Sequence, residues 1–303
     1  MAPDISFIIT ARNEEPVILE KTISGLIETT EQCASEIIVV DDGSTAPVVC
    51  TQKEVLLIRN NAPVGVSQSR RYGASLAKGN VLVWLDAHMT FAPDWLDQML
   101  AHVDSGSLLC SAFWNYEQTI RHCFGADFVW RGERNYFEQL YPGFGLRHRT
   151  EFPGFGAVEI PMIIGACYMI LRDSYVKLGG FSPLLRIWGC DEQDLSARAW
   201  ITGIGVKCVT GAKVGHLDRQ QFPYTVQFEH LEFNQLTLIK TIFENQTVKL
   251  LEEFFNPLPI QVQEWLDKVD LSEWRNTVQS NRQITDKEFF RGFVPSLTHS
   301  PFS

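Results

Sequence analysis

The chain has 303 residues, 45% of them hydrophobic and 20% charged, so it can bury a full core and disorder is not expected. With 26 Lys and Arg against 36 Asp and Glu, its formal charge is -10, which argues against binding of nucleic acid or of an anionic membrane and favours a small polar ligand. Seven scattered cysteines without a Cys-x-x-Cys pair argue against a disulfide framework and a zinc site. Neither a signal peptide nor a membrane span is recognisable, so we expect a cytoplasmic protein.

The first part of the chain alternates between short apolar runs and amphipathic stretches, which is typical of a parallel sheet with helices between its strands. Because ligands of such sheets bind beyond the carboxyl ends of the strands, Thr10, Asp42 and Asp86 are expected near one pocket. The first βαβ unit comprises strand 5–9, helix 15–28 and strand 36–40, and the second comprises strand 55–58, helix 67–77 and strand 81–85.

The rest of the chain has a different pattern. Residues 110–161 are irregular and rich in glycine and aromatic residues, and we interpret them as substrate-facing loops. Residues 229–255 have helical periodicity, and two prolines end it before two short helical segments that contain Trp265 and Trp274. We therefore expect helices after the α/β part.

A carboxylate and two imidazoles are candidates for a metal site. Asp86 and His88 directly follow strand 81–85 and stand two positions apart, so both side chains can turn toward one cation. His216 follows a short apolar stretch around residues 206–209 and is the candidate third ligand. Each motif alone is more often structural, because an aspartate after a strand is commonly a helix cap and a lone histidine is usually a satisfied structural residue.

Several short motifs follow one another along the chain. They are Thr-Ala-Arg-Asn-Glu at 10–14, Asp-Asp-Gly-Ser at 41–44, Asp-Ala-His at 86–88, Trp-Gly-Cys-Asp-Glu-Gln-Asp at 188–194, Val-Gly-His at 214–216 and Arg-Gln-Gln-Phe-Pro-Tyr-Thr at 219–225. In this order they resemble the motifs of the polypeptide N-acetylgalactosaminyltransferases and, more loosely, of the family 2 glycosyltransferases with the GT-A fold. The resemblance extends from about residue 5 to residue 243.

This resemblance implies a site for a UDP-sugar donor. The family's first motif binds the base, so Thr10 would flank the uracil and the carboxylate of Asp42 would accept a hydrogen bond from its imide. The Arg and Tyr of the last motif meet the diphosphate in the family, and a His between them there is Phe222 here. The donor-binding candidates are Thr10, Arg12, Glu14, Asp42, Arg70, Asp86, Gly165, Trp188, Arg219 and Tyr224.

The resemblance also makes Asp86, His88 and His216 ligands of Mn²⁺ or Mg²⁺. Arg70 falls on helix 67–77, where it either reaches the donor sugar or phosphate or belongs to a solvated helix face. Gly165 stands where the family has a glycine pair against the donor sugar, and helix–strand packing is the alternative reason for a glycine there.

The acidic motif bears on stereochemistry. Inverting family 2 enzymes use a Glu-Asp pair to deprotonate the acceptor, whereas the retaining polypeptide transferases have Asn at the position that is Glu192 here. We therefore name Glu192, with Asp191 beside it, as the catalytic candidate and favour inversion. A sugar-binding role of Glu192 in a retaining site is the alternative.

The resemblance thus predicts a metal-dependent glycosyltransferase that moves a hexose or N-acetylhexosamine from a UDP-sugar to a peptide, glycan or small-molecule acceptor. The expected fold is α/β: a GT-A, Rossmann-like, mostly parallel sheet flanked by helices. The expected catalytic domain spans 1–230, with a nucleotide-sugar half at 1–110 and an acceptor and catalytic half at 111–230, and a helical C-terminal extension spans 231–303. A nucleotidyltransferase would show a glycine-rich basic loop after the first strand, which is missing, and a non-catalytic carbohydrate-binding protein is the second alternative.

Overall fold

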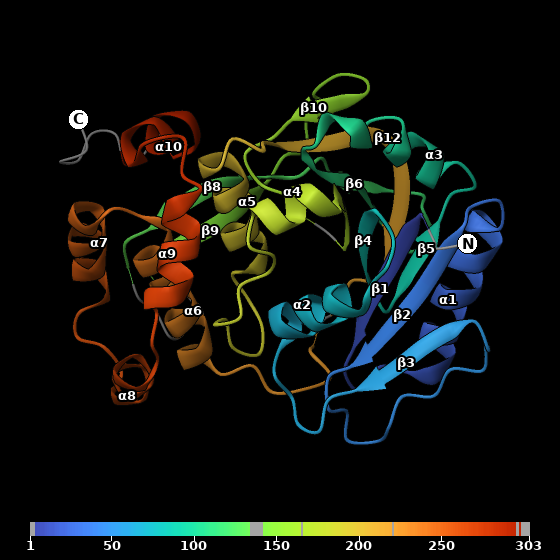
Figure 1. Cartoon of the computed structure of the whole chain (residues 1–303), viewed down its shortest axis with the longest axis horizontal. Helices are drawn as coiled ribbons and strands as arrows, with labels where there is room; N and C mark the ends of the chain where they lie inside the picture. Colours follow the sequence, from blue (N-terminus) through green and yellow to red (C-terminus); the bar gives the residue numbers. More distant parts are fainter. Residues whose placement is uncertain (1–3, 134–141, 165, 220, 295–296, 298–303) are drawn as a thin grey trace.

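The computed structural model describes residues 4–133, 142–164, 166–219, 221–294 and residue 297. In these residues the chain forms one large mixed sheet flanked by helices, followed by a group of helices near the C-terminal end (Figure 1). The blue N-terminal strands and the orange and red C-terminal helices lie at opposite ends of the molecule in this view.

The first six elements follow the predicted βαβ pattern. They are β1 (Ile5–Ala11), α1 (Pro16–Thr30), β2 (Ser35–Asp41), β3 (Val55–Arg59), α2 (Val66–Leu76) and β4 (Val81–Asp86). The four strands run parallel in the order β3-β2-β1-β4. Each strand is slightly longer than its apolar run, because polar residues at the strand ends still pair: Thr10 lies opposite Asp86 in the ladder. The carboxyl ends of these strands therefore meet at one edge, as predicted.

The described part of residues 110–161 consists largely of strands, so the prediction of irregular loops is wrong there; residues 134–141 of that range lie outside the described residues. The glycines of this region suggest turns in the sequence, but some of them are required because another part of the chain packs closely against the strand. A Cβ on Gly143 would lie 2.3 Å from the side chain of Gln235, and one on Gly145 would lie 2.5 Å from that of Arg131. The elements are β5 (Met89–Phe91), α3 (Trp95–Leu100), η1 (Val103–Ser105), β6 (Leu108–Asn115), β7 (Arg121–Cys123), β8 (Ala126–Arg131), β9 (Gly143–His148), β10 (Ala157–Glu159), β11 (Cys167–Leu171), α4 (Arg172–Lys177), α5 (Asp191–Ile201) and β12 (Val206–His216).

The sheet continues past β4 through an antiparallel β11, then β6 and β12, which are parallel to each other, and ends at β10. β8 and β9 form a separate two-stranded antiparallel sheet. β12 extends well beyond the apolar stretch at residues 206–209, and its register shifts between Val209 and Lys213. Its last part pairs with β5, with His216 opposite Met89. Strand pairing thus carries His216 to the turn that holds His88.

The predicted C-terminal helices are present. They are α6 (Phe228–Ile242), α7 (Asn245–Glu252), η2 (Glu253–Phe255), α8 (Ile260–Lys268), α9 (Ser272–Ser280) and α10 (Asp286–Phe293). Helix α10 lies within the predicted helical extension, and a capping box of Thr285 and Glu288 marks its start. One buried apolar cluster joins these helices to the middle of the chain, since Phe128 and Phe144 share it with Phe233 and Phe289.

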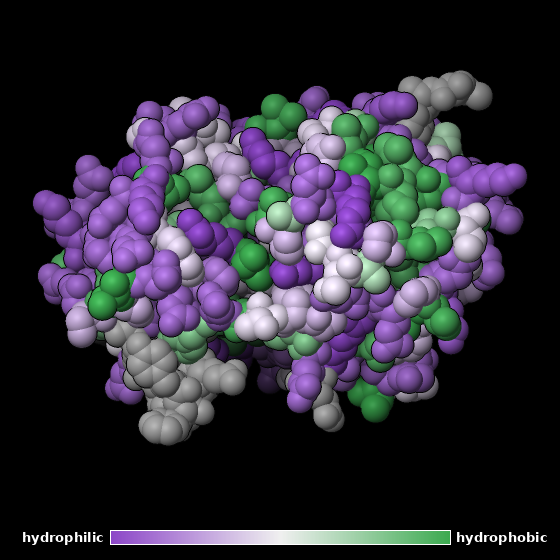
Figure 2. Space-filling view, turned by 90° about the horizontal axis from the view of Figure 1, so that it is seen from below, coloured by the Kyte–Doolittle hydropathy of each residue, from purple (hydrophilic) through white to green (hydrophobic). Residues whose placement is uncertain are grey.

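The lower face of the molecule is largely hydrophilic, and apolar residues gather at its right, on the side of β3 (Figure 2). β3 is an edge strand, and its Leu56 and Leu57 are 49% and 36% exposed. Among the described residues, no helix has the length and apolar character that crossing a bilayer requires.

Candidate functional site

A cavity of about 510 Å³ lies at the carboxyl ends of the central strands. Its wall combines residues of the first motif, the end of β4, the start of α5 and the segment after β12. Of the site residues predicted from the sequence, Gly165 lies outside the described residues. The others all line the cavity: Thr10, Arg12, Glu14, Asp42, Arg70, Asp86, His88, Trp188, Asp191, Glu192, His216, Arg219 and Tyr224.

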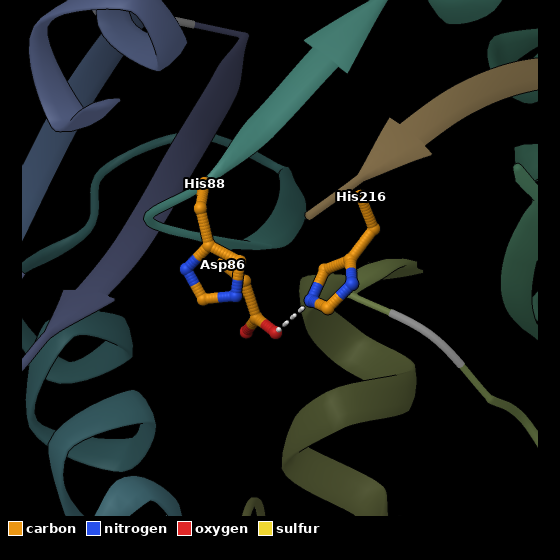
Figure 3. Close-up of side chains that lie close together, drawn as sticks. All are labelled: Asp86, His88 and His216. Atoms are coloured by element: carbon orange, nitrogen blue, oxygen red, sulfur yellow. Dashed lines mark ion pairs between the residues drawn. The ribbon is translucent and has the colours of Figure 1, made fainter. Parts of the chain in front are cut away.

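Asp86, His88 and His216 line this cavity, and their side chains lie close together (Figure 3). Each offers one ligand atom, and these atoms lie within 4.8 Å of one another. The Nε2 atom of His216 is 3.4 Å from Oδ2 of Asp86, and the two imidazole centroids are 4.6 Å apart. One carboxylate and two imidazoles form a mixed oxygen and nitrogen donor set that can bind a first-row divalent cation such as Mn²⁺, whereas Mg²⁺ prefers oxygen ligands. The three residues therefore fit a divalent cation.

The Nδ1 atom of each of these two histidines contacts a carboxylate of another residue. Nδ1 of His88 is 2.9 Å from Oε2 of Glu14, and Nδ1 of His216 is 3.2 Å from Oδ1 of Asp218. Such contacts fix the orientation of a metal-binding imidazole and leave its Nε2 free for the ion. Glu14 also pairs with Arg219 through its other oxygen, and its side chain is only 3% exposed. Both oxygens of Glu14 are thus engaged by protein, whereas the sequence had suggested a contact with the base.

Arg70 lies between the two acidic parts of the site. It is 3% exposed, so the interpretation as a solvated helix face is wrong. Its Nη2 donates to Oδ1 of Asp86 over 2.9 Å, and its Nη1 pairs with Asp191. Burial alone would raise the pKa of Asp86, but the hydrogen bond from His216 and the charge of Arg70 hold it well below its ordinary value.

The candidate base Glu192 stands in the first turn of α5 with Asp191. Burial, followed by the charge of Asp191, raises the pKa of Glu192 to about 8, while Arg70 and Tyr168 oppose the shift. The hydroxyl of Tyr168 donates to Oε1 of Glu192 over 2.7 Å. Sequence reasoning missed Tyr168 because a tyrosine within an apolar strand gives no functional signal.

Asp42 is buried and lines the same cavity. Its Oδ1 accepts hydrogen bonds from the amide of Val64, the side chain of Asn60 and the hydroxyl of Ser69, at 2.8 to 3.0 Å. Its Oδ2 accepts from the amide of Gly65 over 3.0 Å. The carboxylate therefore shapes the turn before α2, and Oδ2 keeps capacity for one more donor.

Three aromatic side chains, Trp188, Phe222 and Tyr224, form part of the cavity wall. The guanidinium of Arg12 lies 4.3 Å from the ring centroid of Tyr224. Phe222 lies 4.6 Å from Trp188 and 5.9 Å from Tyr224, centroid to centroid. Nη1 of Arg12 is buried without a hydrogen-bond partner among the described residues. A cation with a free donor and flat aromatic faces suit a ligand that carries a base and phosphates.

The fold and this site together define the class of the protein, a glycosyltransferase of the GT-A fold. The protein-family sequence model described as Glycosyl transferase family 2 matches residues 6–179, which are more than half of the chain. The chain therefore belongs to this family. A second model, described as the N-terminal domain of galactosyltransferase, matches residues 155–221, which include the acidic motif and His216.

Curated relatives point the same way. Human polypeptide N-acetylgalactosaminyltransferase 14 is 30% identical over 236 residues, which are 73% of this chain and 42% of the relative. Drosophila melanogaster polypeptide N-acetylgalactosaminyltransferase 8 is 30% identical over 242 residues, 74% of this chain and 40% of the relative. The chain thus spans less than half the length of these relatives.

Solved structures confirm the predicted GT-A architecture. A crystal structure of GalNAc-T7 with UDP, GalNAc and Mn²⁺ matches 99% of this chain and 58% of that chain, with a TM-score of 0.77 and 21% sequence identity. S. aureus TarS in complex with UDP-GlcNAc matches 97% of this chain and 85% of that chain, with a TM-score of 0.53 and 13% identity.

Proposed function

We propose that this protein transfers a hexose or N-acetylhexosamine from a UDP-sugar to an acceptor hydroxyl, on a peptide, a glycan or a small molecule, with Mn²⁺ or Mg²⁺ as cofactor. The observation that carries the proposal is the convergence of Asp86, His88 and His216 within 4.8 Å beside the carboxylates of Asp191 and Glu192. The relatives named as polypeptide N-acetylgalactosaminyltransferases and the UDP and Mn²⁺ in the GalNAc-T7 structure support it.

The residues divide the task between them. Thr10, Asp42 and Arg12 bind the uridine, and Tyr224 contacts the diphosphate together with Arg219. A divalent cation held by Asp86, His88 and His216 supplies charge neutralisation for the departing diphosphate. Arg70 keeps Asp86 ionised and in place.

We favour inversion of the anomeric centre, with Glu192 as the general base that deprotonates the acceptor. Its raised pKa suits a base that works near neutral pH. The second candidate is a retaining enzyme like the polypeptide transferases, in which Glu192 binds sugar hydroxyls. The hydrogen bond from Tyr168 favours this second role, because it occupies one carboxylate oxygen. The anomeric configuration of the product distinguishes the two mechanisms.

A cytoplasmic location is also part of the proposal, in keeping with the seven free cysteines.

The decisive experiment is a donor screen with Mn²⁺ present. We expect turnover of a UDP-sugar that stops in EDTA and returns with added Mn²⁺. His216→Ala should weaken the binding of metal and UDP together, and Asp42→Ala should lower the affinity for UDP, measured by calorimetry. Full activity in chelator would contradict the metal role, and equal binding of CDP and UDP would contradict the role of Asp42. Tight sugar binding without any turnover would favour a non-catalytic carbohydrate-binding protein.

A further inference from the structure

The segment from Leu185 to Cys190 leads the chain into the catalytic carboxylates. It places Trp188 in the cavity wall and ends where α5 begins with Asp191. Its backbone is unusual, since Ile187 has φ 51°, Gly189 φ 95° and Cys190 φ 70°. Two of these residues are not glycines, so this left-handed backbone persists only where surrounding contacts hold it.

One set of contacts comes from the start of α2, on the donor side. The side-chain amide of Gln68 donates to the carbonyl of Leu185 over 3.1 Å, and the amide of Val66 donates to the carbonyl of Ile187 over 2.9 Å. Gly65 permits this approach, because a Cβ there would lie 2.5 Å from the backbone nitrogen of Ile187.

The other set comes from a single side chain on α6. Asn234 is fully buried, and its Oδ1 accepts from the amide of Arg186 over 2.7 Å. Its Nδ2 lies 2.9 Å from the carbonyl oxygen of Arg186, 3.2 Å from that of Trp188 and 3.0 Å from that of Gly189. One side-chain amide thereby hydrogen-bonds to backbone groups on both sides of Ile187.

The next residue of α6, Gln235, contacts the backbone of β9 near the same segment. Gln235 exchanges hydrogen bonds with the backbone of Phe144 in both directions, at 2.8 and 2.9 Å. The side chain of Gln193, next to Glu192 on α5, donates to the same carbonyl over 3.2 Å. Two consecutive side-chain amides of α6 therefore contact two backbone segments near the carboxylates, the segment before α5 and strand β9.

We infer that Asn234 is a positioning residue for the carboxylates of Asp191 and Glu192, so that α6 supports this part of the active site. This inference rests on the proposed function. Asn234 contacts the backbone of the 186–189 segment, while Asp86, His88, His216 and Asp42 lie on other elements. Loss of Asn234 should therefore displace the carboxylates and leave the binding of nucleotide and metal in place.

The test compares Asn234→Asp and Asn234→Ser with Thr241→Val. Asp keeps the shape and the acceptor but removes the donors, and Ser keeps a small donor. Thr241 is the matched control, because it is fully buried on the same helix and its hydroxyl bonds only within that helix. We expect both Asn234 variants to lose about tenfold or more in kcat, since a small misplacement of a catalytic group can cost about a hundredfold. Their Kd for UDP with Mn²⁺ should stay within about twofold, and Thr241→Val should change neither quantity.

Hydrogen exchange gives a readout that does not depend on turnover. The amides of Val66 and Asp194 donate to the carbonyls of Ile187 and Cys190 without touching Asn234. Both should exchange faster in the Asn234 variants and stay protected in Thr241→Val. A kcat close to that of the wild type, or a parallel loss of kcat and UDP affinity, would overturn the inference. A wild-type protein that turns over no nucleotide sugar would refute the proposed function itself, and that result is obtained before any variant is compared.

Discussion

The side chain of Glu192 is subject to opposing influences. Burial and the charge of Asp191 favour its neutral form, whereas Arg70 and the hydroxyl of Tyr168 favour the carboxylate. A general base acts only when ionised, so the rate of transfer should rise with pH as Glu192 loses its proton. If Glu192 is the general base, as proposed, removing these contacts one at a time should shift the pH dependence of transfer.

We predict that Glu192→Gln lowers kcat by about a hundredfold or more, because general-base catalysis is typically worth about 10²–10⁴. The affinity for UDP should stay nearly unchanged, and Glu151→Gln, at an exposed position, serves as the control. Steady-state kinetics measures the loss, and NMR of the product gives its anomeric configuration. An α-linked product from an α-linked donor, or a variant with most of its kcat, would assign Glu192 to sugar binding in a retaining enzyme.

Tyr168→Phe tests the role of Glu192 by removing a hydrogen bond that favours its ionised form. The hydroxyl of Tyr168 stabilises the ionised carboxylate, so its removal should raise the pKa of Glu192 further. The rising limb of kcat/KM against pH should then move to higher pH. A limb that stays in place would show that another group titrates in the wild-type profile.

Glu14 offers a prediction about the metal. Its carboxylate contacts Nδ1 of His88 and pairs with Arg219, so in the proposed function it would orient one metal ligand and one diphosphate contact. Glu14→Ala should weaken Mn²⁺ binding about 10–100-fold, the usual effect of losing such a contact, as measured by electron paramagnetic resonance of free Mn²⁺. Its neighbour Glu15 is exposed, so Glu15→Ala should leave the affinity unchanged. Equal affinities in the two variants would restore a direct contact of Glu14 with the nucleotide as the better interpretation.

At the scale of elements, the junction between α2 and the segment before α5 depends on Gly65. This glycine has φ 104°, and any Cβ would meet the backbone of Ile187. Helix α2 presses against the segment at this point, so the donor half and the carboxylates are joined by direct backbone contact.

Gly65→Ala should therefore destabilise the fold by about 1–3 kcal/mol, the usual range for strain at a special backbone conformation. Gly292 on α10 is the matched control, because a Cβ there would meet nothing within 4 Å. Gly292→Ala should stabilise the protein by about 0.4–1 kcal/mol, since it restricts the unfolded chain without strain. Urea denaturation compares the two, and a Gly65→Ala variant as stable as the wild type would contradict the close packing.

At the scale of the whole molecule, the helices after residue 230 complete a core that begins in the middle of the chain. Phe233, Leu236 and Ile239 of α6 are buried in the same cluster as Phe128 and Phe144. The division of the chain at residue 230 stays a prediction about its organisation.

A chain that ends at residue 230 should lose cooperative unfolding, because the apolar surfaces of β8 and β9 would lose the side chains that cover them. We expect weak near-UV circular dichroism and binding of a hydrophobic dye, the signs of lost side-chain packing. A sharp unfolding transition in the truncated chain would instead show that residues 1–230 fold independently.

The sequence by itself determined the parallel α/β core and many, but not all, of the residues that line the site. Alternating apolar runs and helical periods are local patterns, and the carboxyl ends of parallel strands meet at one edge, so Thr10, Asp42 and Asp86 could be placed together. The strands between residues 110 and 161 were not predicted, because glycines that are required by close packing have the same sequence pattern as loop residues.

Only the tertiary structure decided how these residues are connected. Arg70 is buried between Asp86 and Asp191, Glu14 faces His88, and Asn234 holds the segment before α5. Each of these contacts joins elements far apart in the chain, and its geometry depends on strand order, on the shifted register of β12 and on the packing of α6. Local patterns in a sequence carry no information about such distances, because hydrogen bonds and ion pairs form only once the packed core has fixed where each backbone lies.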